Sequence, residues 1–236
     1  MVGAFKNLLT DPGEWHPSME GLDFNRIDGE NAARLEEAFT EEEVFSTLSD
    51  LNEDKAPGPD GFSISFWQFN WDFMKEEVIG FLKEFHEHGR FVRSLNSTFL
   101  VLFPKKAGAK DLRDFKPISL VGGLYKLLAK VLTNRLKKVV GKVVSSAQNA
   151  FVEGRQILDA ALIANEAINS MLKRNESGVL CKLDIEKAYD HLNWNFLLLV
   201  LQIMGFEEKW TGWISWCIST INGTPTGFFN RSRGLH

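Results

Sequence analysis

A run of twelve residues, 179–190, combines a strand pattern with carboxylates that could hold a metal ion; it reads Val-Leu-Cys-Lys-Leu-Asp-Ile-Glu-Lys-Ala-Tyr-Asp. Its first half alternates, which predicts a β-strand that ends at Asp184, and the residues from Lys187 onward predict a helix. A carboxylate at the carboxyl end of a strand lies at the mouth of a sheet, where ligands and metal ions bind. The alternative is that Asp184 caps the helix that follows.

The whole run resembles motif A of the reverse transcriptases, in the form carried by plant LINE-type (non-LTR) retrotransposons. The resemblance implies that Asp184, together with the backbone carbonyl of Ile185, holds catalytic Mg²⁺. It also implies that Tyr189 is the aromatic gate that excludes a ribose 2′-hydroxyl. Asp-x-x-x-x-Tyr alone is a weak pattern, whereas the full Leu-Asp-Ile-Glu-Lys-Ala-Tyr-Asp is a specific one.

Two lysines flank a charged turn between strand-like segments. Residues 98–103 are apolar or β-branched and predict a buried strand, and a second strand-like segment covers residues 114–120. A hairpin would bring Lys105 and Lys116 near one anion. The segment resembles the fingers hairpin of the same family, whose basic residues bind the incoming triphosphate. Most relatives have Arg where this chain has Lys116, and lysine keeps the charge but loses the bidentate geometry.

The clearest helix pattern covers Leu124 to Val140, where apolar residues recur at helical spacing. Five basic residues occupy the remaining positions. Contact with a nucleic-acid backbone is one interpretation of these charges, and a solvated helix face is the other. The basic positions are Lys126, Lys130, Arg135, Lys137 and Lys138.

Two further segments resemble the same family. The turn-rich loop 54–61 reads Asp-Lys-Ala-Pro-Gly-Pro-Asp-Gly, which predicts a rigid loop. It is similar to a segment just ahead of the family's fingers that is thought to lie along the template. Residues 148–156 resemble the element between fingers and palm, and Arg155 is its candidate phosphate contact.

The charge is unevenly distributed along a chain whose net charge is −4. Residues 1–60 carry fifteen acidic and four basic side chains, a net of −11, whereas residues 90–142 carry thirteen basic and two acidic ones, a net of +11. A basic block inside an acidic protein predicts a polyanion-binding surface.

No apolar run approaches the ~20 residues that span a bilayer. The two cysteines make neither a disulfide framework nor a zinc site, which indicates a reducing, intracellular setting.

Several helices and their limits follow from caps and apolar spacing. Thr40 begins a capping box and Gly89 is a predicted helix stop. Helices are also expected at residues 157–172, 192–204 and 210–217. Within residues 62–88 the expected core positions are Phe66, Trp67, Phe69, Phe73, Val78, Phe81, Leu82 and Phe85.

These patterns together predict an α+β, helix-rich, partial right-hand polymerase fold, with fingers and an incomplete palm. The expected divisions are a lead-in segment at 1–39, a fingers-like region at 40–175 and the first part of the palm at 176–236. The resemblance implies an RNA template, a DNA primer and Mg²⁺, and no membrane association is expected.

The sequence contains no Asp-Asp pair. Two-metal nucleotidyl transfer needs carboxylates that hold two ions about 4 Å apart. We therefore expect a truncated, inactive fragment of an RNA-directed DNA polymerase. The alternatives are a non-catalytic nucleic-acid-binding remnant acting through residues 90–142, and a decayed reading frame with no function.

Overall fold

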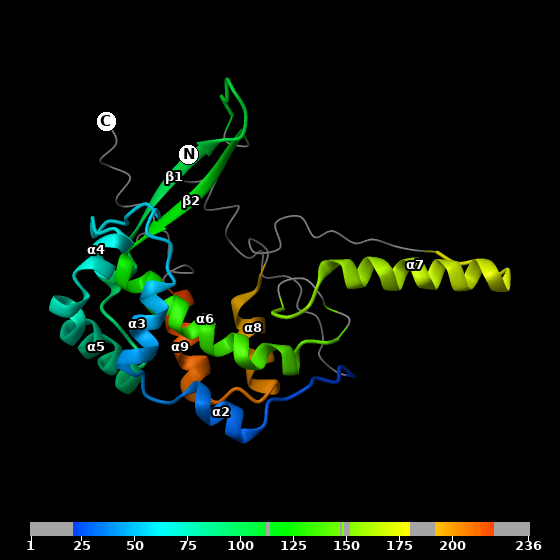
Figure 1. Ribbon diagram of the computed structural model, residues 1–236, viewed down its shortest axis with the longest axis horizontal. Helices are drawn as coiled ribbons and strands as arrows, with labels where there is room; N and C mark the ends of the chain where they lie inside the picture. Colours follow the sequence, from blue (N-terminus) through cyan, green and yellow to red (C-terminus); the bar gives the residue numbers. More distant parts are fainter. Residues whose placement is uncertain (1–20, 112–113, 147, 149–151, 180–191, 220–236) are drawn as a thin grey trace.

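The computed structural model describes residues 21–111, 114–146, 148, 152–179 and 192–219 (Figure 1). These residues form a helix-rich fold with one small antiparallel sheet. The elements in chain order are α2 (Gly29–Leu35), α3 (Glu41–Ser49), α4 (Ile64–Phe69), α5 (Trp71–His88), the 3₁₀ turn η1 (Arg93–Asn96), β1 (Thr98–Pro104), β2 (Phe115–Val121), α6 (Gly123–Val143), α7 (Ile157–Arg174), α8 (Trp194–Ile203) and α9 (Glu208–Ser219).

Helix α3 begins and α5 ends at the residues that the sequence predicted. The Thr40 hydroxyl accepts a hydrogen bond from the Glu43 amide at 3.1 Å, and this satisfies one of the donors that a helix leaves free at its start. Gly89 takes a left-handed conformation with φ 65°, which a residue without a Cβ adopts at no steric cost. Both predictions are confirmed.

The core is formed mainly by helices α3, α5, α6 and α9, with residues from the N-terminal segment. An aromatic cluster joins three parts of the chain: the ring of Trp213 lies 5.6 Å from that of Phe39 and 5.5 Å from that of Phe85. The apolar stripe predicted for α6 is confirmed, and each fully buried aliphatic side chain contributes about 1.5–3 kcal/mol. Its buried aliphatic members from the predicted stripe are Leu127, Leu128, Val131, Leu132 and Val139.

Residues 27–39, the end of the expected lead-in segment, contribute side chains to this core. Ile27, Leu35 and Phe39 are buried, and the Ile27 amide donates a hydrogen bond to the Met204 carbonyl at 2.9 Å. Helix α2 is capped by Asp28, whose carboxylate accepts from the Asn31 amide. This part of the expected lead-in segment therefore packs on the helices, and the division of the chain into regions stays a prediction.

Two aromatic residues expected in the core lie on the surface. Phe69 is 90% exposed and Phe73 is 83% exposed. Residues 62–88, for which one or two helices are expected from the sequence, form two helices that meet at Asn70, whose side-chain amide donates to the Phe66 carbonyl at 2.8 Å. Because the break changes the direction of the chain, Trp71 at the start of α5 is buried in place of its neighbours.

Strands β1 and β2 form an antiparallel hairpin that projects from the helices (Figure 1). The register pairs Thr98 with Val121 and Pro104 with Phe115. The hairpin itself was expected, but the description of its first strand as buried is wrong, since Phe99 is 47% and Phe103 55% exposed. Within the described residues the sheet has these two strands, and each of their residues is half-buried or exposed.

Helix α7 extends away from the other helices (Figure 1). Its start is fixed by a reciprocal pair of bonds between Gln156 and Asp159, and it ends at Asn175, which is left-handed with φ 53°. The predicted helix is confirmed, although its apolar side chains remain on the surface. None of the helices in the described ranges is both long enough and apolar enough to cross a bilayer.

Candidate nucleic-acid interface

The hairpin places its two predicted lysines at its outer end. Lys116 on β2 pairs with Phe103 on β1, and the Lys105 amide donates to the Asp114 carbonyl at 2.7 Å. Lys105 lies at the bend that directly follows β1, so both lysines are at this end of the hairpin. This meets the geometric condition for two cations that share one anion, and binding of the anion stays a prediction.

Asp114 holds the turn of the hairpin in shape. Its carboxylate pairs with the Lys106 ammonium at 2.7 Å and accepts from the backbone amides of Lys110 and Asp111. The hydrogen bond from Lys106 is the main cause that lowers the pKa of Asp114 below its usual value, with the two amides adding to it. The turn is therefore closed by a group that stays ionised at neutral pH.

The turn-rich loop 54–61 is docked on the start of α6. The Asp60 carboxylate accepts a hydrogen bond from the Gly123 amide at 2.7 Å, and this supplies the helix with a cap from a distant part of the chain. A Cβ on Gly58 would lie 2.5 Å from the Gly122 amide nitrogen, so the loop approaches this backbone closely only because Gly58 lacks a side chain. The Lys126 ammonium closes the contact by donating to the Ala56 carbonyl at 2.7 Å.

Arg135, a predicted nucleic-acid contact, is instead a buried structural residue. Its side chain is 7% exposed and forms an ion pair with Glu43 at 2.6 Å. Its five N–H groups are all engaged: Nε and Nη2 donate to Glu43, and the other bonds go to the carbonyls of Leu35, Glu37 and Ala38. Its guanidinium also lies 4.4 Å from the centre of the Phe39 ring. No donor is left for a phosphate, and the prediction for this residue is wrong.

Arg155 is likewise occupied by the protein itself. Its Nη1 donates to the carbonyls of Ser145 and Gln148, and its Nη2 donates to those of Gly141 and Val144. These carbonyls are at or just beyond the end of α6, where a helix leaves acceptors unsatisfied and where a positive charge is favoured. Arg155 thus caps α6, and its predicted role as a phosphate contact stays a prediction.

The lysines predicted on α6 lie nearer to solvent. Lys137 and Lys138 are exposed, and Lys137 has one weak partner, Glu153, at 3.9 Å. Lys126 and Lys130 are half-buried on the side of α6 that faces loop 54–61. Contact of these four residues with nucleic acid stays a prediction.

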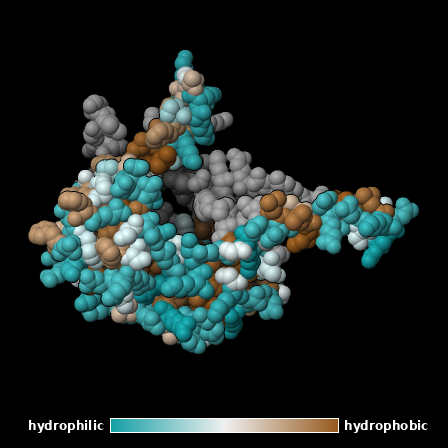
Figure 2. Space-filling model, in the orientation of Figure 1, coloured by the Kyte–Doolittle hydropathy of each residue, from teal (hydrophilic) through white to brown (hydrophobic). Residues whose placement is uncertain are grey.

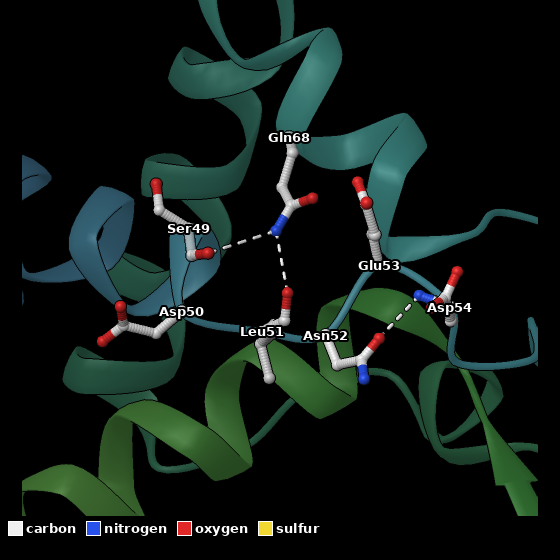
Figure 3. A pocket seen from close by; sticks show the side chains of 7 residues that line it. All are labelled: Ser49, Asp50, Leu51, Asn52, Glu53, Asp54 and Gln68. Atoms are coloured by element: carbon white, nitrogen blue, oxygen red, sulfur yellow. Dashed lines mark hydrogen bonds between the residues drawn. The ribbon is translucent and has the colours of Figure 1, made fainter.

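A hollow of about 540 Å³ lies at the end of α3 (Figure 3). Asp50, Glu53 and Asp54 contribute carboxylates to it, but Figure 3 shows these side chains diverging rather than meeting at one point. Gln68 donates to the Leu48 and Leu51 carbonyls at 2.9 Å each and so caps α3. Among the described residues, no group of three His, Cys, Asp or Glu could hold a metal ion.

The predicted catalytic residues Asp184, Ile185 and Tyr189 lie outside the described residues. Sequence reasoning missed the roles of Gly58 and Asp60 in the contact between the loop and α6. The sequence has glycines at 58 and 61 in the loop and at 122 and 123 before α6. These glycines could have indicated that the two backbones approach each other closely.

Comparison with known proteins gives the family of this domain. Residues 103–236 match the family described as reverse transcriptase (RNA-dependent DNA polymerase), and the chain belongs to that family. It is 30% identical over 208 residues to the transposon TX1 uncharacterized 149 kDa protein of Xenopus laevis, covering 86% of the chain and 16% of that protein.

Two further relatives come from insects. The chain is 23% identical over 226 residues to the retrovirus-related Pol polyprotein from type-2 retrotransposable element R2DM of Drosophila melanogaster, covering 96% of the chain and 20% of that protein. It is 22% identical over 161 residues to the corresponding polyprotein from type-1 retrotransposable element R2 of Nasonia vitripennis, covering 68% of the chain and 15% of that protein. The chain thus carries a reverse transcriptase domain with non-LTR retrotransposon relatives, and it spans a fifth or less of their length.

Proposed function

We propose that the chain forms the nucleic-acid-binding fingers, and the beginning of the palm, of an RNA-directed DNA polymerase of a non-LTR retrotransposon. The reaction class follows from family membership. The observation that carries the binding role is the contrast on α6, where Arg135 is used inside the protein while Lys137 and Lys138 stay exposed. Exposed lysines in a block with a net charge of +11 suit a polyanion partner.

The hairpin is the proposed site for the triphosphate of the incoming nucleotide. Lys105 and Lys116 both lie at its outer end, which the Lys106–Asp114 ion pair fixes. Two ammonium groups held in this way neutralise part of the charge of a triphosphate without needing to move into place. Tyr189 is the proposed gate against a ribose 2′-hydroxyl.

Asp184 is the proposed metal ligand, since a carboxylate is the hard oxygen donor that Mg²⁺ prefers. When bound, a pair of Mg²⁺ ions would orient the reacting phosphates and neutralise their charge. A single carboxylate does not hold both ions, because Mg²⁺ gives up its water reluctantly. We therefore propose that these 236 residues bind nucleic acid more readily than they catalyse nucleotidyl transfer.

The binding role is tested by fluorescence anisotropy with a labelled single-stranded RNA of arbitrary sequence. We expect affinity to fall steeply between low and moderate salt, and to fall further in the double variant Lys137→Glu/Lys138→Glu. The matched control is Lys83→Glu/Lys173→Glu, which makes the same change in net charge at exposed positions outside residues 90–142. Equal losses in the two variants, or no binding by the natural chain, would rule the proposal out.

A non-catalytic role in binding nucleic acid is the second candidate. The observation that favours it is the net charge of +11 on residues 90–142, which suits a polyanion partner with or without catalysis. The two candidates share the binding surface and differ only in catalysis. Primer extension therefore separates them.

A further inference from the structure

Two phenylalanines project outward where α4 meets α5: Phe69 is the last residue of α4, and Phe73 lies in the first turn of α5. Asn70 joins the two helices and makes a backbone hydrogen bond at helical spacing to each side, of 3.1 and 3.0 Å. The rings, four residues apart, therefore stand on consecutive turns. Trp71, about 200° round the helix from Phe73, enters the core instead.

Both rings are almost completely exposed. Since a phenylalanine side chain has about 200 Å² of surface, the pair offers roughly 350 Å² of apolar area, as much as the largest apolar patch on many monomers. Figure 2 shows apolar surface at the junction of α4 and α5, with hydrophilic surface around it. The exposed Phe45 lies 5.4 Å from the Trp71 ring, whereas neither Phe69 nor Phe73 packs against another ring of the described residues.

The surface around this pair is acidic. Asp72, Glu76 and Glu77 are exposed on the first two turns of α5, and none of them makes an ion pair with a residue that the structure describes. Lys75 is the single basic residue in the stretch 69–77, and its ammonium lies 3.2 Å from the Glu41 carboxylate of α3. The two rings thus stand among carboxylates whose charge nothing in the described part of the chain neutralises.

This charge selects among the surfaces that could cover the rings. Exposed aromatic rings can stack on the bases of RNA or DNA, but three carboxylates repel the phosphates beside those bases. An anionic membrane surface is disfavoured for the same reason. Two copies of the chain that met through this patch would bring like charges together. A protein surface that is apolar at its centre and basic at its rim complements the patch in both respects.

We propose that Phe69 and Phe73 anchor a protein partner that presents an apolar groove flanked by lysine or arginine side chains. The two rings fill the groove, and Asp72, Glu76 and Glu77 face the basic rim. Aromatic anchors in a pocket supply much of the binding energy of an interface, while charges at its rim set specificity and the rate of association. This surface uses no residue of the basic block 90–142, so it adds a protein-binding role to the proposed function.

The test uses a fluorescent amphipathic helical peptide with leucines on one face and lysines beside them, and a second peptide with glutamate in place of each lysine. We expect the natural chain to bind the basic peptide at least about tenfold more tightly than the acidic one. Phe69→Ser/Phe73→Ser should weaken binding of the basic peptide at least about tenfold. Glu76→Gln/Glu77→Gln should weaken it less, and mainly at low salt. Because both rings are exposed, the melting temperature of the serine variant should stay within error.

The matched control is Leu158→Ser/Leu162→Ser, which removes exposed apolar side chains of α7 and should change peptide binding less than about twofold. Equal losses in the two serine variants, equal binding of the two peptides, or no binding by the natural chain would overturn the proposal. A loss of RNA binding, of binding to phosphatidylserine vesicles or of self-association in Phe69→Ser/Phe73→Ser would overturn it too, and would assign the patch to that other ligand.

Photo-cross-linking locates the contact directly. Benzoylphenylalanine in place of Phe73 should cross-link to the basic peptide and not to the acidic one. The same group in place of Phe45, whose ring lies against Trp71, should give little product. No cross-link at position 73, or equal yields at the two positions, would show that the peptide binds elsewhere on the chain.

Discussion

Arg135 shows why charge alone does not assign a function to a residue. It lies in the most basic helix of the chain, yet it is four residues from both Val131 and Val139, which places it within the buried stripe. That spacing was visible in the sequence and indicates an inward-facing side chain. A buried arginine needs acceptors for all its donors, and Glu43 with three carbonyls supplies them.

Replacing Arg135 should therefore change stability rather than binding alone. Arg135→Ala leaves the Glu43 carboxylate and three carbonyls without their donor, and we expect it to lower the free energy of unfolding by about 3–5 kcal/mol. Lys138→Ala, on an exposed site of the same helix, should change it by less than about 0.5 kcal/mol. Urea denaturation of both variants measures the difference. Similar values for the two would contradict the structural role of Arg135.

The hydroxyl of Tyr125 should titrate late. Burial, followed by the influence of Cys217, raises the pKa of Tyr125 from 10.0 to about 12. Because the folded pKa is the higher one, the contribution of this group to stability is fully present below pH 10 and is lost as the pH rises to about 12. The near-ultraviolet absorbance of tyrosinate reports this titration.

Tyr189→Phe removes the only other tyrosine and isolates the signal. The Tyr125→Phe variant is the control without the Tyr125 hydroxyl. It also loses the hydrogen bond from that hydroxyl to the Cys217 carbonyl. Ionisation of Tyr125 near pH 10 in a chain that is still folded would show that the residue is not buried as described.

At the scale of the elements, local patterns predicted which helices exist better than how far each extends. The stripe of α6, the cap at Thr40 and the stop at Gly89 all follow from residue types and spacing. The break at Asn70 does not, because asparagine is tolerated inside helices and only the tertiary burial of Trp71 favours ending α4 there. The loop on α6 could be predicted as a loop, but its partner could not, since the two segments are some 63 residues apart.

The contact between this loop and α6 should not tolerate a methyl group. In Gly58→Ala the new Cβ would overlap the backbone of Val121 and Gly122, and backbone atoms cannot move away cheaply. We expect a loss of about 1–3 kcal/mol in the free energy of unfolding. Gly80→Ala in α5, where a Cβ meets nothing within 4 Å, should instead stabilise the chain by about 0.5–1 kcal/mol.

Thermal unfolding of the two alanine variants compares them under one set of conditions. A shift of the same sign in both would mean that the measured effect comes from glycine's freedom in the unfolded chain rather than from the close approach at Gly58.

Helix α7 should cause self-association of the 236-residue chain. Figure 2 shows apolar surface on the helix that extends from the body, and Leu158, Leu162 and Leu172 are 67%, 63% and 71% exposed. Apolar area removed from water contributes about 25 cal/mol per Å², so two such helices gain by pairing. Sedimentation velocity should show dimers or larger species, and Leu158→Gln/Leu162→Gln should shift the chain toward monomer.

The control for this experiment is Asn165→Gln/Asn169→Gln, which leaves the apolar positions of α7 unchanged. A natural chain that sediments as a monomer at micromolar concentration would show that the exposed residues of α7 do not drive association.

At the scale of the whole molecule, the two charged regions partly neutralise each other. The acidic N-terminal part pairs with the basic block through Glu43 and Arg135 at 2.6 Å, and through Asp28 and Lys142 at 3.9 Å. The uneven charge could be predicted from the sequence. The ion pairs between the two regions could not, because they depend on how α2 and α3 pack against α6. The lysines without such partners are what remains for an external polyanion.

The last prediction concerns catalysis by these residues alone. Phosphoryl transfer depends on positioned positive charge at the reacting phosphates, and one carboxylate of a metal-binding set does not fix two ions. Primer extension on an RNA template, with Mg²⁺ or Mn²⁺, should therefore give no product from the 236-residue chain or from its Asp184→Asn variant. Product that forms with the natural chain and disappears in Asp184→Asn would show instead that another carboxylate, Asp190 or one from a second copy, completes the site. RNA binding measured on the same samples keeps a folded, inactive chain distinct from a misfolded one.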